Sequence, residues 1–369
     1  MSQSFHSLKI SGKINETSDS ASFLFEIPEE LKEAYNFQAG QYLTVKVHVN
    51  GEELRRSYSI FTAPGEDDFG FTVKRLKGGR VSNYLIDNFS EGDSMELMTP
   101  EGNFTLTANP AAQRDHYFIS GGSGITPVMS MIQTVLEEEP MSKAFLIYCN
   151  RNEDSIIFKN KLQQLENKYA GQFVLRHVLS QPSTEKASGI KGIFGKKVSS
   201  WDGWTGRIDA GKLQLFFDEN ESHSGEDHYY MCGPEGLIQT TENYLSNKGI
   251  SSDRMHKEYF TTADVSEEQK EENISSSEAC TAEVSLNGEN FTVEIPSDKT
   301  VLEALLDMGK DAPYSCTSGA CSTCVAKVSE GEIEMDVCFA LDEKEVADGY
   351  ILTCQSRAKS SNLKLKFEG

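Results

Sequence analysis

Four cysteines near the C-terminal end have the residue type and the spacing to bind a metal cluster. Cys316, Cys321 and Cys324 are separated by four and two residues, and 29 residues separate Cys324 from Cys354. Thiolates are soft, anionic ligands for ferric iron, and C-x4-C-x2-C with a distant fourth cysteine is the plant-type 2Fe–2S pattern. Small residues and a glycine between the first two cysteines let backbone amides approach the sulfides. We therefore predict that these four cysteines hold a 2Fe–2S cluster.

A structural zinc site and a group of buried free thiols are the alternatives. Zinc sites usually combine two CxxC-like knuckles, and here only Cys321 and Cys324 form one. Cys280 and Cys338 lie outside the pattern and are interpreted as small buried residues. Crowding of cysteines in the last quarter of the chain favours metal binding in a reducing compartment over disulfides.

Two glycine-containing turns are candidates for binding a dinucleotide. Residues 121–127, Gly-Gly-Ser-Gly-Ile-Thr-Pro, follow a predicted strand and open a helix, whose N-terminus favours a pyrophosphate. Thr126 suits the N-cap of this helix and Pro127 its first turn. Pro127 stands where the G-x-G-x-x-G fingerprint has its third glycine, and no P-loop lysine follows. An ordinary tight strand–helix turn would look similar.

The second turn, Cys232-Gly233-Pro234, also ends a predicted strand and begins a helix. Cys232 either fills the core or faces a nicotinamide. Asn150 and Arg151 end the middle strand, where the adenosine half of a dinucleotide would lie. An acidic residue there would bind ribose hydroxyls, whereas Arg151 suits the 2′-phosphate of NADPH. The pattern favours NADPH over NADH, although a single surface arginine is often only solvated.

Two segments in the first hundred residues are candidates for binding a flavin. Arg56 and Tyr58 alternate along one predicted strand and share a face, which suits a pyrophosphate and a flat ring. Residues 77–83, Lys-Gly-Gly-Arg-Val-Ser-Asn, form a candidate phosphate loop that opens a short helix through Leu85. Either segment alone is a common pattern in unrelated proteins.

Two hydrophobic patterns predict the elements that position these residues. Up to about residue 109, strands with period-2 alternation are separated by turn-rich breaks, which predicts a small antiparallel barrel. The expected strands are 21–27, 43–49, 57–62, 69–75 and 94–98. From His116 the pattern becomes strand, loop and helix, which predicts a parallel sheet covered by helices on both faces. Its expected strands are 117–120, 144–149 and 229–232.

Two segments lie outside this pattern. The Gly- and Lys-rich stretch 183–200 is predicted to be a surface loop. The acidic, serine-rich stretch 262–279 is predicted to be a flexible linker, either a passive tether or one that lets the C-terminal domain swing. A compact β-rich domain with a helix near 301–308 follows it. The predicted domains are therefore 1–110, 111–261 and 280–369.

Composition excludes some classes of function. The formal net charge of −22 at pH 7 argues against binding to nucleic acid or to an anionic membrane. It suits a soluble protein or one that docks on a basic partner. No stretch approaches the roughly 20 apolar residues of a membrane-spanning helix. The first residues lack the apolar run of a secretory signal, so we expect a cytoplasmic location.

Taken in order, the motifs resemble those of the ferredoxin–NADP reductase superfamily. Its R-x-Y-S and G-x-V-S flavin motifs are matched by residues 56–59 and 79–82, and its GGxGxTP and C-G-P nicotinamide motifs by 121–127 and 232–234. Residues 37–42 are similar to the stretch before the flavin strand. Glu258-Tyr259-Phe260 stands where the family often has an acidic residue and an aromatic residue near the flavin.

The resemblance implies a multidomain fold: an antiparallel β-barrel FAD domain, an α/β parallel-sheet NADP domain and an α+β, β-grasp-like 2Fe–2S ferredoxin domain. It implies that the catalytic residues are Ser59, Thr126, Cys232 and Glu258, with Ser59 near the flavin's reactive nitrogen. It implies cofactor contacts from Arg56, Ser57, Tyr58, Ser59, Val73, Lys74, Gly79, Val81, Ser82, Gly122, Gly124, Thr126, Asn150, Arg151, Cys232, Gly233, Pro234 and Phe260.

A plant-type ferredoxin domain placed after a reductase is similar to the order in reductase components of multicomponent oxygenases, such as those of phenylacetyl-CoA epoxidase and ketosteroid hydroxylase. The resemblance implies that electrons pass from NADPH through FAD and a 2Fe–2S cluster to a terminal oxygenase. A fatty-acyl desaturase as the acceptor and a redox-sensing flavoprotein are the alternatives. The complete series of flavin and nicotinamide motifs disfavours the redox sensor, because a sensor needs no hydride path.

Overall fold

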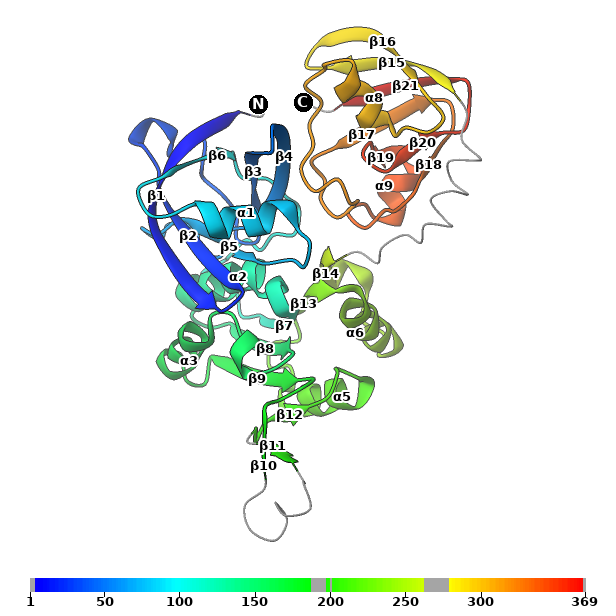
Figure 1. Ribbon diagram of the computed structural model, residues 1–369. Helices are drawn as coiled ribbons and strands as arrows, with labels where there is room; N and C mark the ends of the chain where they lie inside the picture. Colours follow the sequence, from blue (N-terminus) through cyan, green and yellow to red (C-terminus); the bar gives the residue numbers. More distant parts are fainter. Residues whose placement is uncertain (1–3, 187–196, 200, 262–278, 368–369) are drawn as a thin grey trace.

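The computed structural model describes residues 4–186, 197–199, 201–261 and 279–367 and shows three bodies packed together (Figure 1). A barrel at the N-terminal end lies above a helix-covered sheet, and the C-terminal domain lies beside the barrel and near β14 (Met255–Thr261). The predicted linker, 262–279, lies outside the described residues except for its last one. Among the helices described, none is long and apolar enough to cross a membrane.

The N-terminal body is a six-stranded antiparallel sheet in the order β4-β3-β6-β1-β2-β5. Its strands are β1 (Phe5–Thr17), β2 (Ser20–Glu26), β3 (Tyr42–Val49), β4 (Glu52–Ser59), β5 (Gly70–Lys74) and β6 (Ser94–Met98). A bridge between Ile60 and Phe71 joins the two edge strands and closes the predicted barrel. Leu43, Val45 and Val47 alternate into its core, as the period-2 pattern predicts. The helix α1 (Arg80–Asn88) packs against β3, β4 and β5.

One barrel strand begins earlier than predicted. β4 spans Glu52–Ser59 rather than 57–62, and it pairs with β3 from Val49 opposite Glu52 to Tyr42 opposite Ser59. Asn50 and Gly51, with φ of 56° and 84°, form the two-residue turn that sets this register. The charged residues that begin β4 hid the strand, whereas the Asn-Gly turn would have revealed it. β1 also lies where no strand was expected.

The second body is a parallel sheet in the order β12-β9-β8-β7-β13-β14. Its other strands are β7 (Asp115–Gly121), β8 (Lys143–Asn150), β9 (Phe173–Leu179), β12 (Trp204–Thr205) and β13 (Asp227–Pro234). The helices α2 (Ile125–Glu138) and α3 (Lys159–Lys168) cover one face, and α5 (Ala210–Glu219) and α6 (Glu235–Asn247) cover the other. The strand order reverses between β7 and β13, and in sheets of this kind the crevice outside the carboxyl ends of such strands is where ligands bind.

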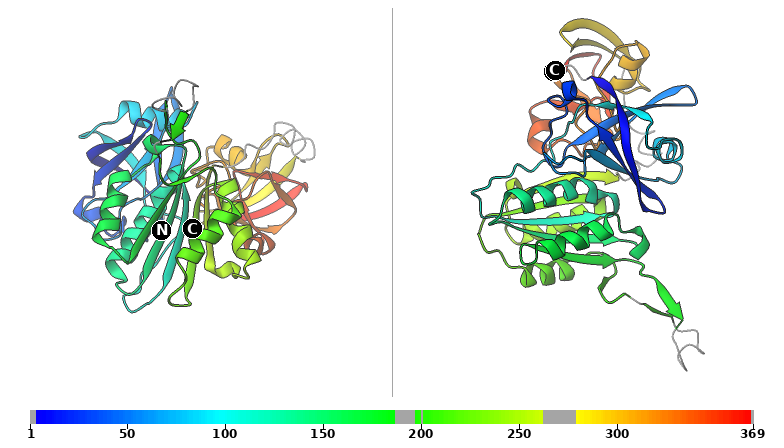
Figure 2. Two further views of the ribbon diagram at one scale, coloured as in Figure 1. Left: turned by 90° about the horizontal axis from the view of Figure 1, so that it is seen from below. Right: turned by 90° about the vertical axis from the view of Figure 1, so that its left-hand side faces the viewer.

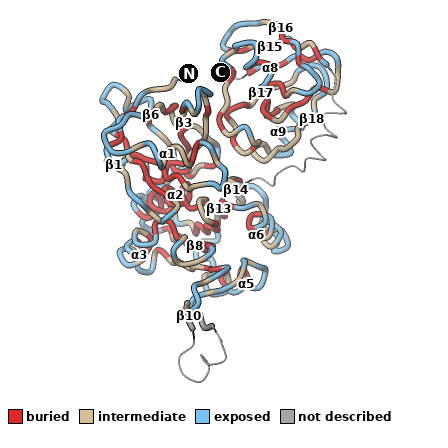
Figure 3. Tube along the Cα trace, in the orientation of Figure 1, coloured by how far each residue is buried: buried red, intermediate tan, exposed pale blue. Residues whose placement is uncertain are grey.

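The barrel and the parallel sheet share one hydrophobic core (Figure 3). Phe61 of the barrel lies 5.0 Å, centroid to centroid, from Phe158 at the start of α3. The helix α2 is also tied to the barrel, because Ser130 Oγ donates to Thr62 O at 2.6 Å and Gln133 Nε2 donates to Phe61 O at 2.9 Å. This packing fixes the carboxyl edge of the sheet relative to β4, which carries the R-x-Y-S motif and is called the flavin strand below.

Two local expectations are corrected. Within the stretch 183–200, β10 (Thr184–Lys186) pairs with β11 (Lys197–Ser199) in a projecting ribbon (Figure 2), and 187–196 and 200 lie outside the described residues. Thr126 is not the N-cap of α2, because the chain already turns through η2 (Gly122–Gly124) and Gly124 takes that position. Thr126 Oγ1 instead donates to Ser123 O at 3.0 Å, while Pro127 lies in the first turn as predicted.

The C-terminal body is a mixed sheet in the order β16-β15-β21-β17-β19, in which only β15 and β21 are parallel neighbours. Its strands are β15 (Cys280–Leu286), β16 (Glu289–Ile295), β17 (Val325–Glu330), β19 (Tyr350–Leu352) and β21 (Asn362–Phe367), with β18 (Ile333–Met335) and β20 (Ser356–Ala358) as a separate pair. The predicted helix is α8 (Val301–Asp307), which begins at a capping box between Thr300 and Glu303, and a short α9 (Glu343–Ala347) precedes β19.

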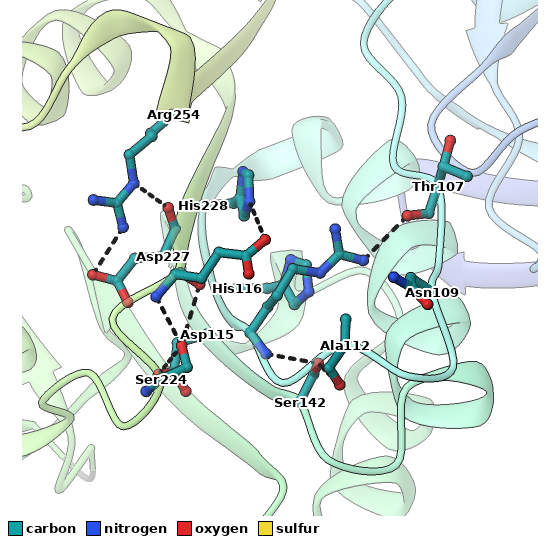
Figure 4. Close-up of polar contacts among 12 residues, drawn as sticks. Thr107, Asn109, Ala112, Asp115, His116, Ser142, Ser224, Asp227, His228 and Arg254 are labelled. Carbon is teal, nitrogen blue, oxygen red and sulfur yellow. Dashed lines mark hydrogen bonds and ion pairs between the residues drawn. The ribbon is translucent and has the colours of Figure 1, made fainter.

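A polar network holds the opposite, amino edge of the parallel sheet (Figure 4). The Asp115 carboxylate at the start of β7 accepts hydrogen bonds from the backbone N–H of Ser224, at 3.0 Å, and of His223. Arg254 Nε donates to the carbonyl of Asp227, at the start of β13, at 2.7 Å. This network lies away from the glycine-containing turns, so we assign it to stability.

Candidate cofactor sites and the cluster loop

The four predicted cluster cysteines come together at one end of the C-terminal domain. Cys316, Cys321 and Cys324 lie on the loop between α8 and β17, and Cys354 follows β19. Thr353 joins the two segments, because its backbone N–H and its hydroxyl donate to Cys324 O at 3.1 and 2.9 Å. Backbone amides point at one of the cysteine sulfurs: Cys321 N and Ser318 N donate to Cys316 Sγ at 3.3 and 3.4 Å.

The four cysteine thiols lie close enough to shift the pKa values of one another. Hydrogen bonds from Cys321 and Cys354 hold the pKa of Cys316 well below its ordinary value, and a hydrogen bond from Cys354 lowers the pKa of Cys324. Four neighbouring cysteines, with backbone amides aimed at the sulfur of Cys316, fit a 2Fe–2S cluster.

Arg56 and Tyr58 share one face of β4, as the sequence predicted, because they lie opposite Val45 and Leu43 of β3. Tyr58 stacks on Phe71 with 5.2 Å between ring centroids. Ser57 and Ser59 lie on the other face, opposite Thr44 and Tyr42.

The first turn of α1 lies beside Arg56. Both Arg80 and Arg56 lie close enough to Glu52 to lower the pKa of its carboxyl, with the hydrogen bond from Arg80 as the largest cause. Gly79 is the N-cap residue and has no side chain that could accept hydrogen bonds from the first-turn amides of α1. These amides therefore remain suited to a phosphate. A Cβ at Gly79 would lie 2.8 Å from Ser82 Oγ, which itself accepts from Leu76 N at 3.1 Å. Two arginines and a helix N-terminus fit the pyrophosphate of FAD.

The other residues expected to contact the flavin are buried, partly buried or paired with another side chain. Val73 is fully buried in the barrel core, so only its backbone can face a ligand, and Lys74 pairs with Asp19 at 3.7 Å. Val81 and Ser82 are buried in the first turn of α1. Phe260 packs partly buried against the core that the barrel and sheet share.

The two nicotinamide turns cross each other at close range. A Cβ on Gly124 would lie 2.3 Å from Cys232 O, and a Cβ on Gly233 would lie 3.0 Å from Gly121 N. Gly122 adopts a φ of +56° with open space beside it. The glycines let β7 and β13 approach at the crevice where the strand order reverses, and they leave a backbone surface that suits a dinucleotide.

Cys232 and Glu258 lie side by side at this crevice, because they are partners in the pairing of β13 with β14. Burial raises the pKa of the Cys232 thiol well above its ordinary value, and the nearby Glu258 raises it further. Burial also raises the pKa of Glu258 to about 8. Glu258 Oε2 is buried without a hydrogen-bond partner in the described structure, so this carboxyl is available to a bound group.

Asn150 and Arg151 differ in exposure. Asn150 ends β8 and is buried, and its Nδ2 has no hydrogen-bond partner among the described residues. Arg151 is exposed, and its carbonyl accepts from Gln181 N at 2.7 Å. An orphaned donor beside an exposed cation, at the carboxyl edge of the sheet, fits the adenosine half of a dinucleotide.

The structure brings the cluster loop against the flavin strand through contacts that no sequence motif predicts. Ser315, which precedes the first cluster cysteine, lies 2.7 Å from Ser57, oxygen to oxygen, and accepts a hydrogen bond from Thr44 at 3.0 Å. Tyr42 Oη lies 2.8 Å from Thr323 Oγ1. The alternation of hydroxyl residues on β3 and β4 was the only sequence signal for this contact.

Models of three protein families match the three bodies. An oxidoreductase FAD-binding domain matches residues 7–106, an oxidoreductase NAD-binding domain matches 118–243, and a 2Fe-2S iron-sulfur cluster binding domain matches 284–359. Together with the fold, these matches define an iron–sulfur flavoprotein reductase and confirm the predicted multidomain architecture.

Whole-chain relatives narrow this class. The chain is 33% identical to a subunit of 1,2-phenylacetyl-CoA epoxidase from Escherichia coli (strain K12), over 99% of this chain and 98% of that protein. It is 32% identical to the ferredoxin reductase component of 3-ketosteroid-9-alpha-monooxygenase of Rhodococcus rhodochrous, over 98% and 96%. The chain therefore belongs to the family of oxygenase reductase components.

A solved structure shows the same domain order. Phthalate dioxygenase reductase is 28% identical to this chain, and the match covers 98% of each chain with a TM-score of 0.59. That reductase is a modular structure for electron transfer from pyridine nucleotides to a 2Fe–2S centre.

Proposed function

We propose that this protein takes electrons from NADPH and delivers them singly, through FAD and a 2Fe–2S cluster, to a partner oxygenase. The observation that carries the proposal is the contact between Ser57, on the R-x-Y-S strand, and Ser315, beside the first cluster cysteine. When bound, the flavin takes up two electrons as a hydride and releases them one at a time, and the cluster carries one electron.

The residues of the chain then have distinct tasks. Arg56 and the first turn of α1, with Gly79, Val81 and Ser82, would bind the pyrophosphate of FAD. Tyr58 would hold the flavin ring, and Ser59 would donate a hydrogen bond near its reactive nitrogen. The turns at Gly122, Gly124 and 232–234, with Thr126 and Cys232, would hold the nicotinamide. Glu258 holds a proton at its carboxyl beside this site.

The proposal includes NADPH rather than NADH as the donor. Arg151 is an exposed cation at the edge where the 2′-phosphate would lie, and Asn150 offers a buried donor next to it. As its partner we propose a terminal oxygenase of the phenylacetyl-CoA epoxidase type, or another ring- or steroid-hydroxylating enzyme, since relatives of both kinds align over nearly the whole chain. None of the eight cysteines forms a disulfide in the described structure, which suits a cytoplasmic location.

Anaerobic titration of the purified protein with NADPH and then with NADH tests this function. We expect about one and a half equivalents of NADPH to bleach both the flavin and the iron–sulfur absorption bands, because the flavin takes up two electrons and the cluster one. We also expect NADH to require a concentration about ten-fold higher, because it lacks the phosphate that pairs with Arg151. A colourless protein, or a flavin reduced without any iron–sulfur bands, would contradict the proposed cofactor chain. Equal half-saturation by the two nucleotides would contradict only the choice of NADPH.

Glu258 predicts a pH dependence. With a pKa of about 8, its carboxyl is neutral at pH 7 and becomes a carboxylate as the pH rises through 8. A buried negative charge opposes the arrival of a hydride beside it. The rate of flavin reduction by NADPH should therefore fall about ten-fold between pH 7 and pH 9, in proportion to the neutral fraction.

Glu258→Gln provides the matched comparison, because glutamine is a neutral hydrogen-bond donor at every pH. Stopped-flow measurements should give this variant a rate near that of the wild type at pH 7 and no decline up to pH 9. If the variant shows the same decline as the wild type, another group is responsible.

A further inference from the structure

The face of the β3–β4 hairpin that turns away from the barrel core is built of hydroxyl groups where it meets the cluster loop. Tyr42 and Thr44 lie two residues apart on β3, and Ser57 lies opposite Thr44 on β4. Tyr42 and Thr44 are 3% and 0% exposed, and Ser315 and Thr323 of the cluster loop are 1% and 7% exposed. Four of the five residues of this contact are thus buried, and Ser57 is partly exposed. We name the contact the hydroxyl seat: Tyr42, Thr44 and Ser57 against Ser315 and Thr323.

The hydrogen bonds of the seat have a defined direction at Thr323. Its single hydroxyl proton is donated to Glu101 Oε2 at 3.2 Å. Thr323 Oγ1 must therefore accept from Tyr42 Oη, at 2.8 Å. The chain runs from the Tyr42 phenol through Thr323 to a carboxylate of the barrel, and an ionised acceptor strengthens such a chain. Thr323 lies between Cys321 and Cys324, so this bond holds the cluster loop itself.

The buried hydroxyl groups favour a single register of the cluster loop against the β3–β4 hairpin. A hydroxyl that loses its partner inside a dry contact carries the full cost of desolvation, whereas each bond that forms adds only a modest gain. A shifted or tilted cluster loop would leave several of these groups unpaired. The seat thus selects one orientation of the C-terminal domain more strongly than it raises the affinity of docking.

Tyr42 also lies next to Ser59, and this second contact links the hydroxyl seat to the proposed flavin site. In the β3–β4 register Tyr42 lies directly opposite Ser59, the residue assigned to the flavin nitrogen. Cross-strand partners of this kind have adjacent side chains on one face. Tyr42 therefore lies between the flavin strand and the cluster loop, while Arg55 fastens the other end of the contact, 4.5 Å from the Tyr314 ring and 3.5 Å from Asp311.

We propose that Tyr42 is the positioning residue of the electron-transfer state: its hydrogen bond to Thr323 holds the cluster loop at the flavin strand in the one productive orientation. This inference rests on the proposed function for its purpose, but the docking that it describes is measurable without turnover. Electron transfer depends steeply on distance, so a loop that is held less often in place passes electrons more slowly.

Tyr42→Phe removes only the phenolic oxygen, and Tyr35→Phe is the matched control. Tyr35 is also in the barrel and 3% exposed, and its hydroxyl donates to Leu97 O at 2.8 Å without reaching the C-terminal domain. In the holoprotein, Tyr42→Phe should speed amide hydrogen exchange over 315–325 about five- to ten-fold, the effect of one lost hydrogen bond. It should slow flavin-to-cluster electron transfer by a similar factor and leave flavin reduction by NADPH unchanged. Tyr35→Phe should change none of these.

A double-mutant cycle with Thr323→Val tests whether the two hydroxyls act through one bond. We expect the combined variant to exchange little faster than Thr323→Val alone. The proposal is overturned if Tyr42→Phe matches Tyr35→Phe in exchange over 315–325, or if the two effects add fully. A wild-type protein that NADPH does not reduce would refute the proposed function and leave the exchange result to decide the docking.

Discussion

Replacing Cys354 with alanine is expected to remove the 2Fe–2S cluster while leaving the flavin reducible by NADPH. Cys354 is the ligand most distant in sequence from the other three, and its thiol lies against Cys316 and Cys324. Even groups that only orient a metal ligand change metal affinity by 10- to 100-fold, so loss of a ligand should exceed about 100-fold. Iron content, the visible iron–sulfur bands and the electron paramagnetic resonance signal of the reduced protein should all disappear. Electron delivery to an acceptor should fall by at least about 100-fold.

Cys338→Ala is the control for this change. Cys338 is half-buried in the same domain, and its thiol reaches only the carbonyl of Leu341, at 4.0 Å. This variant should keep its iron and its spectrum, with at most a small loss of stability. Full iron content and an unchanged spectrum in Cys354→Ala would contradict the assignment of the four ligands.

Gly124→Ala is expected to destabilise the protein and to abolish its use of NADPH. The backbone at Gly124 is ordinary, with φ −61°, so an alanine is excluded by space alone. Its Cβ would lie 2.3 Å from Cys232 O and 2.8 Å from Gly233 N. Neither backbone atom can move away without parting β7 from β13, so we expect a loss of about 3 kcal/mol in the free energy of unfolding. A domain of this size should then melt roughly 6–12 °C lower.

Function should fail in Gly124→Ala even where the fold survives. Displacing the crossing of the two turns moves the backbone that receives the nicotinamide, and misplacement by about 1 Å costs on the order of 100-fold in rate. Stopped-flow flavin reduction below the melting temperature measures this loss. Gly236→Ala is the control, because a Cβ on Gly236 in α6 meets no atom within 4 Å and alanine favours the helix. If Gly124→Ala has the same melting temperature and the same rate of flavin reduction as Gly236→Ala, the close contact of the two turns is not needed for stability or for the use of NADPH.

Sequence patterns predict most of the fold where local chemistry decides it. The strand predicted at 94–98 is β6, and the helix predicted near 301–308 is α8, which the structure shows to begin at a capping box. The predicted position of β4 is wrong because Glu52, Glu53 and Arg55 hide a strand whose limits are set by pairing with β3 through the Asn50-Gly51 turn. Thr126 has a residue type that suits an N-cap, whereas the turn before α2 places Gly124 there.

The sequence by itself determined which groups this protein can hold. Cysteine spacing at 316, 321, 324 and 354, and glycines at the ends of strands, specify sulfur ligands and close backbone approach, and both are properties of short segments. Only the tertiary structure decided how the parts meet. Tyr42 and Thr323 are 281 residues apart in the chain, and no motif that contains either residue marks the two as partners. Their contact exists because the barrel register aims Tyr42 away from the core, and because a buried hydroxyl is stable only where a second hydroxyl arrives to meet it.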